Sequence, residues 1–257
     1  MVDQLFSELA SLPQIEAIAL GGSRAGACYD ENSDYDVYLY CTAPIPEDIR
    51  RDILNKYCSY MEIGNHFWEQ EDNCTLNNGP DIDILYRNLD SFIADVASVV
   101  EQHQSRNGYT TCMWHNLRTC RILCDKSGRL EEAKKRFNVP YPQALKQSIL
   151  HRNFKLLTGT LPAYDGQIRK AVVRDDRVSI NHRITAFLES YFDLLFALNE
   201  QTHPGEKRLM LLCRESCTIL PEDVEENLTR LLTHAQTEPE QICDDLNRIL
   251  TALSKIL

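Results

Sequence analysis

The chain has 257 residues, of which 43% are hydrophobic and 25% charged, a composition typical of a globular protein with one large domain or two modest ones. No apolar run approaches the roughly 20 residues that span a bilayer, so we expect no membrane helix. Met1–Leu12 lacks a basic flank and a continuous apolar stretch. It is interpreted as a short amphipathic helix rather than a signal peptide, which predicts a cytoplasmic protein.

The net charge of −11 bears on the kind of partner. A protein that grips a polynucleotide neutralises phosphates with a basic surface, and this balance opposes that. We therefore expect a small ligand and no nucleic acid polymer, although the charge could also serve solubility alone. The ten cysteines are interpreted as reduced thiols, because no export signal accompanies them.

Residues 1 to about 138 combine short apolar runs with turn signals. Two of these runs are separated by Asn77, Asn78, Gly79 and Pro80, which predicts a hairpin. The expected strands are Ile15–Leu20, Asp34–Tyr40, Asn65–Cys74, Asp81–Tyr86 and Arg121–Cys124, and the expected helices are Pro46–Tyr60, Ser91–Gln102 and Leu130–Phe137.

Residues from about 139 onward have helical spacing almost throughout, and Pro140 and Pro142 mark the change. The expected helices are Pro142–Thr158, Tyr164–Val173, Val178–Gln201, Gly205–Cys217, Pro221–His234 and Pro239–Leu257. The sequence thus predicts an α+β fold, with a small mixed β-sheet domain over residues 1–138 and a C-terminal helical bundle over residues 139–257.

Two features near the N-terminus predict phosphate and metal chemistry. Gly22 and Ser23 follow the first strand, where a glycine turn and a helix start present backbone N–H groups to an anion. After a spacer of ten residues come Asp34 and Asp36, which point to one face if the segment is a strand. Paired carboxylates suit Mg²⁺, although a solvated acidic turn would show the same pattern.

A third carboxylate lies on the later strand, where Asp83 alternates with apolar residues. If this strand lies beside Asp34–Tyr40, Asp83 completes a cluster of three carboxylates with Asp34 and Asp36. Such a cluster can hold two metal ions for in-line displacement at phosphorus.

Gly22 and Ser23, the ten-residue spacer, the Asp34 and Asp36 pair and the later Asp83 together resemble the signature of the polymerase-β-like nucleotidyltransferase superfamily. Within it the chain is similar to bacterial antibiotic nucleotidyltransferases, the aminoglycoside and lincosamide groups, and to a related uncharacterised bacterial family of the same two-part build. The resemblance implies an enzyme, a transferase that binds ATP or another nucleoside triphosphate with Mg²⁺ as the cofactor.

The resemblance also implies residue roles. Asp34, Asp36 and Asp83 would bind the metal and act in catalysis, and Gly22 and Ser23 would contact the triphosphate. AMP would pass to a hydroxyl of a small-molecule acceptor lying between the two domains. Relatives often dimerise, so a homodimer is one expected assembly.

Weaker candidates have a structural alternative beside the functional one. Arg24 would touch phosphate or form a surface salt bridge, and Lys207 would reach the triphosphate or stay a solvated lysine. The acids Glu69, Glu71 and Asp72 are candidates for a separate base, or else form an exposed strand edge. His66, Trp68 and His182 are interpreted as packing residues or, second, as lining of an acceptor pocket.

Two rival functions remain open at this point. One is transfer of AMP to a protein, as in antitoxin-like minimal nucleotidyltransferases, against which the added helical domain argues. The other is a nucleotide-binding module without turnover, against which the three retained aspartates, Asp34, Asp36 and Asp83, argue.

Overall fold

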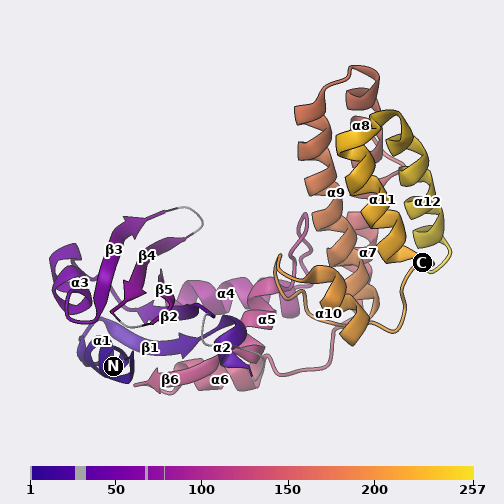
Figure 1. Ribbon diagram of the computed structural model, residues 1–257. Coiled ribbons are helices and arrows are strands. Elements are labelled where there is room, and N and C mark those ends of the chain that lie inside the picture. Colours follow the sequence, from indigo (N-terminus) through magenta and orange to yellow (C-terminus); the bar gives the residue numbers. More distant parts are fainter. Residues whose placement is uncertain (1, 27–32, 67–68, 78) are drawn as a thin grey trace. The chain divides into compact units, whose positions relative to one another are not determined.

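A six-stranded mixed sheet has the strand order β3-β4-β5-β2-β1-β6 (Figure 1). The computed structural model describes residues 2–26, 33–66, 69–77 and 79–257. Strands β2 and β5 run parallel, and the other neighbouring strands are antiparallel. The strands are β1 (Ile15–Leu20), β2 (Tyr35–Cys41), β3 (Cys58–Asn65), β4 (Gln70–Leu76), β5 (Asp81–Arg87) and β6 (Arg121–Asp125).

The chain has the α+β fold that the sequence predicts, with this mixed sheet and with helices in the C-terminal region. It packs into two compact units. The sheet unit consists of Met1–Ala97 and Asn116–Val139, and the helical unit of Ser98–His115 and Pro140–Leu257. The division into functional domains at residue 138 stays a prediction. Among the described residues, no helix has the length and apolar character to cross a membrane.

One face of the sheet is covered by α1 (Val2–Ser11) and α3 (Glu47–Leu54). Because side chains alternate along a strand, every second residue of β2 and β5 points into this core. The buried side chains that share it include Leu5, Leu9, Val37, Leu39, Ile53, Leu54, Ile82 and Ile84. Residues between these positions therefore point to the opposite face.

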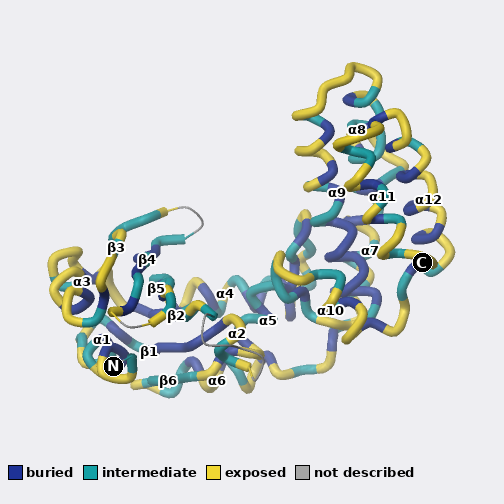
Figure 2. Tube along the Cα trace, viewed as in Figure 1, coloured by how far each residue is buried: buried dark blue, intermediate teal, exposed yellow. Residues whose placement is uncertain are grey.

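On that opposite face lie Asp36, Tyr38 and Tyr40 of β2. The Tyr40 ring packs 5.3 Å from Phe92 of α4 (Leu89–Val100), measured between ring centroids. Asn116 of α5 (Cys112–Thr119) donates a hydrogen bond of 2.7 Å to the Tyr38 hydroxyl. Helices thus cover Tyr40, which is fully buried, whereas Asp36 near the start of β2 stays half-buried. The neighbouring strand β1 is buried along most of its length (Figure 2).

The helical unit is built around α9 (Arg177–Leu198), whose aromatic side chains Phe187, Tyr191, Phe192 and Phe196 are buried, as the sequence predicts. The other helices of this unit are α7 (Gln143–Leu157), α8 (Tyr164–Val173), α10 (Leu209–Ser216), α11 (Val224–Thr237), the short 3₁₀ helix η1 (Pro239–Gln241) and α12 (Ile242–Ser254).

A buried carboxylate ties the segment Ser98–His115 to these helices. Asp193 on α9 accepts hydrogen bonds from the Thr110 backbone N–H at 2.9 Å and from the Thr110 hydroxyl at 2.7 Å. Asn153 on α7 donates a third bond of 2.8 Å to the same carboxylate. All three side chains are almost fully buried, so this network positions the segment within the unit.

Several predicted elements differ from the structure. The helix expected over Pro46–Tyr60 ends at Leu54, because β3 begins at Cys58 and pairs with β4. The strand expected over Asn65–Cys74 lies at Gln70–Leu76. Helix α5 was not expected, and α6 occupies Arg129–Arg136 near its expected place. The helix expected from Gly205 starts at Leu209, because Gly205 and Arg208 have positive φ angles of 111° and 58°.

Candidate functional site

Two of the predicted metal ligands lie side by side on the sheet. Asp36 of β2 and Asp83 of β5 are register partners in the parallel pairing of these strands. Both are half-buried and both point to the face away from the α1 and α3 core. Neighbouring strands are about 4.8 Å apart, so the two carboxylates lie within reach of one cation.

The predicted phosphate turn lies directly against one of these carboxylates. β1 leads into Gly21 and then into the single helical turn α2 (Gly22–Ala25), and the Gly21 N–H donates a 2.8 Å bond to the carbonyl of Asp36. Gly22 has a φ angle of +57°, and a Cβ built on it would lie 1.8 Å from Oδ2 of Asp36. Only glycine leaves room for this approach, and both Gly22 and Ser23 are exposed to a ligand.

The remaining residues near the turn are placed differently. Asp34 is exposed and lies before the first residue of β2, and part of the spacer, residues 27–32, lies outside the described residues. Arg24 donates a 2.5 Å bond from Nε to the carbonyl of Ser33, and its guanidinium lies 4.0 Å from the centre of the Tyr35 ring. Arg24 therefore holds the two ends of the spacer near each other.

The fit of a divalent metal follows from these placements. Within the described parts of the chain, no group of three or more His, Cys, Asp or Glu side chains is arranged to hold a metal ion. The structure thus brings Asp36 and Asp83 together and does not join Asp34 to them in a preformed group. Two carboxylates remain a suitable set for Mg²⁺, which usually keeps water and substrate phosphates as its other ligands.

Asp83 is held by a neighbouring amide. The Nδ2 atom of Asn73 on β4 donates a 2.8 Å bond to Oδ1 of Asp83. The Oδ1 atom of Asn73 accepts a 2.7 Å bond from Asn65 at the end of β3. This contact was not predicted, because it depends on the pairing of Asn73 with Asp83 across β4 and β5.

The three acids near the start of β4 separate into three environments. Asp72 is fully buried on the core face, where it forms an ion pair with Arg50 and accepts a 2.7 Å bond from the Tyr86 hydroxyl. Glu69 forms two hydrogen bonds, of 2.7 and 2.5 Å, with Arg87. Neither acid is part of an exposed strand edge, and each is matched by an arginine.

Glu71 is the third of these acids and has a different environment. Its side chain is 8% exposed and has no hydrogen bond or ion pair with any described residue. Burial raises its pKa, and the nearby charges of Asp83 and Glu69 raise it further. An unneutralised carboxylate beside Asp83 makes this part of the sheet favourable for a cation.

The remaining described candidates have no comparable setting. Lys207 is exposed in the turn before α10, within the helical unit. His66 and His182 are both exposed, so the interpretation of these two as packing residues is wrong. Trp68 lies outside the described residues.

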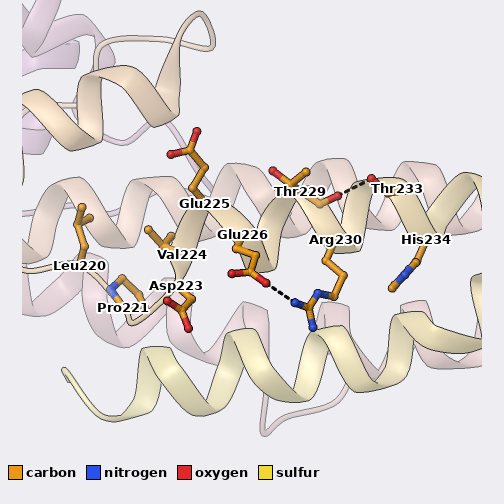
Figure 3. A pocket seen from close by; sticks show the side chains of 10 residues that line it. All are labelled: Leu220, Pro221, Asp223, Val224, Glu225, Glu226, Thr229, Arg230, Thr233 and His234. Carbon is orange, nitrogen blue, oxygen red and sulfur yellow. Dashed lines mark hydrogen bonds and ion pairs between the residues drawn. The ribbon is translucent and has the colours of Figure 1, made fainter.

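A shallow groove of about 790 Å³ follows α11 in the helical unit (Figure 3). Several of its charged or titratable side chains have partners, with Glu226 and Arg230 2.5 Å apart and His234 2.7 Å from Asp245. Glu225 is paired with Arg214 at 3.0 Å. We therefore assign this groove no part in catalysis.

Comparisons with known proteins give a family match and several similar solved structures, two of which follow. Residues 110–209 match a family described as a domain of unknown function (DUF4037). A nucleotidyltransferase-like protein from Exiguobacterium sibiricum is 11% identical, with a TM-score of 0.43 over 100% of this chain and 74% of that one. An aminoglycoside 6-adenyltransferase from Bacillus subtilis is 10% identical, with a TM-score of 0.31 over 99% and 89% of the two chains. No curated protein matches the sequence.

The DUF4037 match begins at residue 110, so it does not include Gly22, Ser23, Asp34, Asp36 or Asp83.

Proposed function

We propose that this chain is a Mg²⁺-dependent nucleotidyltransferase that moves AMP from ATP to a hydroxyl of a small-molecule acceptor. One observation supports the proposal above all others. The turn at Gly22 and Ser23 lies against Asp36, and Asp36 is the register partner of Asp83. The exposed residues of the turn, which would bind phosphate, therefore lie beside two adjacent carboxylates, which would bind a cation.

Each residue has a distinct role in this proposal. The N–H groups of the α2 turn and the hydroxyl of Ser23 bind the triphosphate, because the first N–H groups of a helical turn have no acceptor within it. Asp36 and Asp83 hold the Mg²⁺, with Asp34 joining them when the substrate is bound. When bound there, Mg²⁺ neutralises charge on the phosphates and orients the departing pyrophosphate.

The transfer itself exchanges one bond for another. The acceptor oxygen forms a bond to the α-phosphorus of ATP, and the bond from that phosphorus to the pyrophosphate oxygen breaks. The acceptor hydroxyl loses its proton to a carboxylate, for which we propose Asp83. Positioning and charge neutralisation contribute most of the rate enhancement in such a site.

A small and cationic acceptor fits the charge of the site. Asp36, Glu71 and Asp83 lie on or beside one face of the sheet, and the whole chain has a net charge of −11. Aminoglycosides and lincosamides are therefore the first acceptors to try. One of the similar structures is that of an aminoglycoside 6-adenyltransferase.

The test is pyrophosphate release from ATP and Mg²⁺ in the presence of an acceptor panel. Asp36→Asn and Asp83→Asn should each lower the rate by at least about 100-fold, as expected when a ligand of a catalytic metal is lost. Asp81→Asn is the matched control, because Asp81 is exposed on the same strand and bonds to Thr75 instead. Turnover that survives in both site variants would remove the proposal.

A further inference from the structure

A chain of side-chain hydrogen bonds crosses three strands and ends at Asp83. Asn73 donates to Oδ1 of Asp83 at 2.8 Å, and Asn65 donates to Oδ1 of Asn73 at 2.7 Å. The same Nδ2 atom of Asn65 also donates to Glu62 at 3.2 Å, and Tyr60 donates to the other oxygen of Glu62 at 2.7 Å. The chain thus runs from β3 through β4 to β5.

A bulge in β3 makes this chain possible. Residues three apart on a regular strand point to opposite faces, so Glu62 and Asn65 would not normally meet. The register of β3 against β4 shifts between Ile63 and Asn65, and Gly64 in this bulge has a φ angle of +81°. The bulge turns Asn65 to the face that carries Glu62 and Asn73.

The orientation of both amides follows from the two ends of the chain. Hydrogen bonds from Tyr60 and Asn65 lower the pKa of Glu62, so this carboxylate is ionised at neutral pH and only accepts. Asn65 must then present its NH₂ group, and Asn73 receives one of these protons on its oxygen. The NH₂ group of Asn73 is therefore left to point at Asp83.

We propose that Asn73 is a positioning residue for Asp83 and that Asn65 sets the orientation of Asn73. The inference rests on the proposed function, because it concerns Asp83 as a metal ligand. The bond to Oδ1 fixes the rotamer of Asp83 and leaves Oδ2 for a cation. Hydrogen bonds of this kind orient metal-binding carboxylates, and their loss typically costs about 10–100-fold in metal affinity.

The test measures Mn²⁺ binding to the full-length chain by EPR titration, with ATP present. Asn73→Ala should weaken Mn²⁺ binding about 10–100-fold. Asn65→Ala should also weaken Mn²⁺ binding, but less than Asn73→Ala does, because the amide of Asn73 remains. Thr75→Ala is the matched control, since Thr75 is two residues along the same strand and bonds to Asp81 at 2.7 Å. It should bind Mn²⁺ like the wild type.

A second measurement separates positioning from a general structural role. The Mg²⁺ concentration for half-maximal pyrophosphate release should rise in Asn73→Ala, while kcat at saturating Mg²⁺ changes less. The inference is overturned if Asn73→Ala folds and binds Mn²⁺ with the affinity of the wild type. If Asn73→Ala does not fold, an unchanged Mn²⁺ affinity in Asn65→Ala overturns it. A wild type that binds Mn²⁺ but releases no pyrophosphate contradicts the proposed function alone. A wild type that binds no Mn²⁺ contradicts both.

Discussion

The α-carbon of Gly22 faces the carboxylate of Asp36 so closely that an added Cβ would lie 1.8 Å from Oδ2. Glycine also suits the backbone there, since φ is +57°. The contact links the turn after β1 to the start of β2, two segments that the sequence separates by more than ten residues. A phosphate bound by the turn would therefore lie next to Asp36.

Gly22→Ala should strongly reduce turnover. The new methyl group must displace Asp36 or the turn, and a displacement of about 1 Å can cost about 100-fold in rate. The left-handed backbone adds a stability cost of about 1 kcal/mol. Steady-state pyrophosphate release and thermal melting measure the two effects.

Gly26→Ala serves as the control for this substitution. Gly26 ends the same turn, its φ is −100°, and a Cβ there would meet its nearest neighbour at an ordinary 3.7 Å. Activity that falls equally in both variants would show that the contact with Asp36 is not the cause.

Glu71→Gln should raise the melting temperature at neutral and alkaline pH. The pKa of Glu71 is raised in the folded chain, so its stabilising contribution is present at low pH and is lost as the pH rises through that pKa. Above that pKa the wild type contains a buried carboxylate beside Asp83 and Glu69, and the amide removes this repulsion. Melting curves at pH 4 and pH 8 test the sign.

Glu62→Gln is the matched control for this comparison. Glu62 lies on the neighbouring strand, and hydrogen bonds lower its pKa instead of raising it. Glu62→Gln should therefore lower or leave unchanged the melting temperature at pH 8. A Glu71→Gln protein that melts below the wild type at pH 8 would contradict the proposed environment of Glu71.

Local patterns predicted much of the fold. The apolar run Ile15–Leu20 coincides with β1, and the turn residues near Gly79 correctly predicted the antiparallel pairing of β4 and β5. These features depend on neighbours in the sequence, as propensity and turn chemistry do. The expectation that the Asp83 strand lies beside the Asp36 strand also matches the pairing of β5 with β2.

Features that depend on register could not be predicted. The bond from Asn73 to Asp83 requires a particular pairing of β4 with β5, and a shift by one residue would turn Asn73 to the other face. The position of Asn65 depends on the bulge at Gly64. Regular alternation of side chains along β3, without the bulge, would place Asn65 on the opposite face of the sheet. The burial of Glu71 likewise follows from what packs over β4, which composition does not reveal.

The last prediction concerns the buried Asp193 of the helical unit. Burial raises its pKa from an ordinary value of 3.8 to about 6, against the opposing effect of bonds from Thr110 and Asn153. Since the folded pKa is the higher one, the folded chain retains a proton that the unfolded chain releases. The stability from this proton is complete below pH 3.8 and is lost as the pH rises through about 6.

Asp193→Asn should remove this pH dependence. The variant can keep most of its hydrogen bonds. Oδ1 of Asn153 is buried without a partner among the described residues, and a flip of the Asn153 amide would let this oxygen accept a bond from the new amide. The stability of the wild type relative to the variant should fall between pH 4 and pH 6, by at most about 1.4 kcal/mol for each pH unit. Urea unfolding at several pH values measures this difference.

Two checks make the Asp193 comparison specific. His203 acts in the opposite direction, because burial lowers its pKa to about 3 and its contribution is lost as the pH falls, but both proteins contain it. Glu222→Gln, at a side chain that is 72% exposed, is the matched control for replacing a carboxylate by an amide. A wild-type advantage that grows from pH 4 to pH 7 would mean that Asp193 is stabilised as the carboxylate. The bonds from Thr110 and Asn153 would then outweigh its burial.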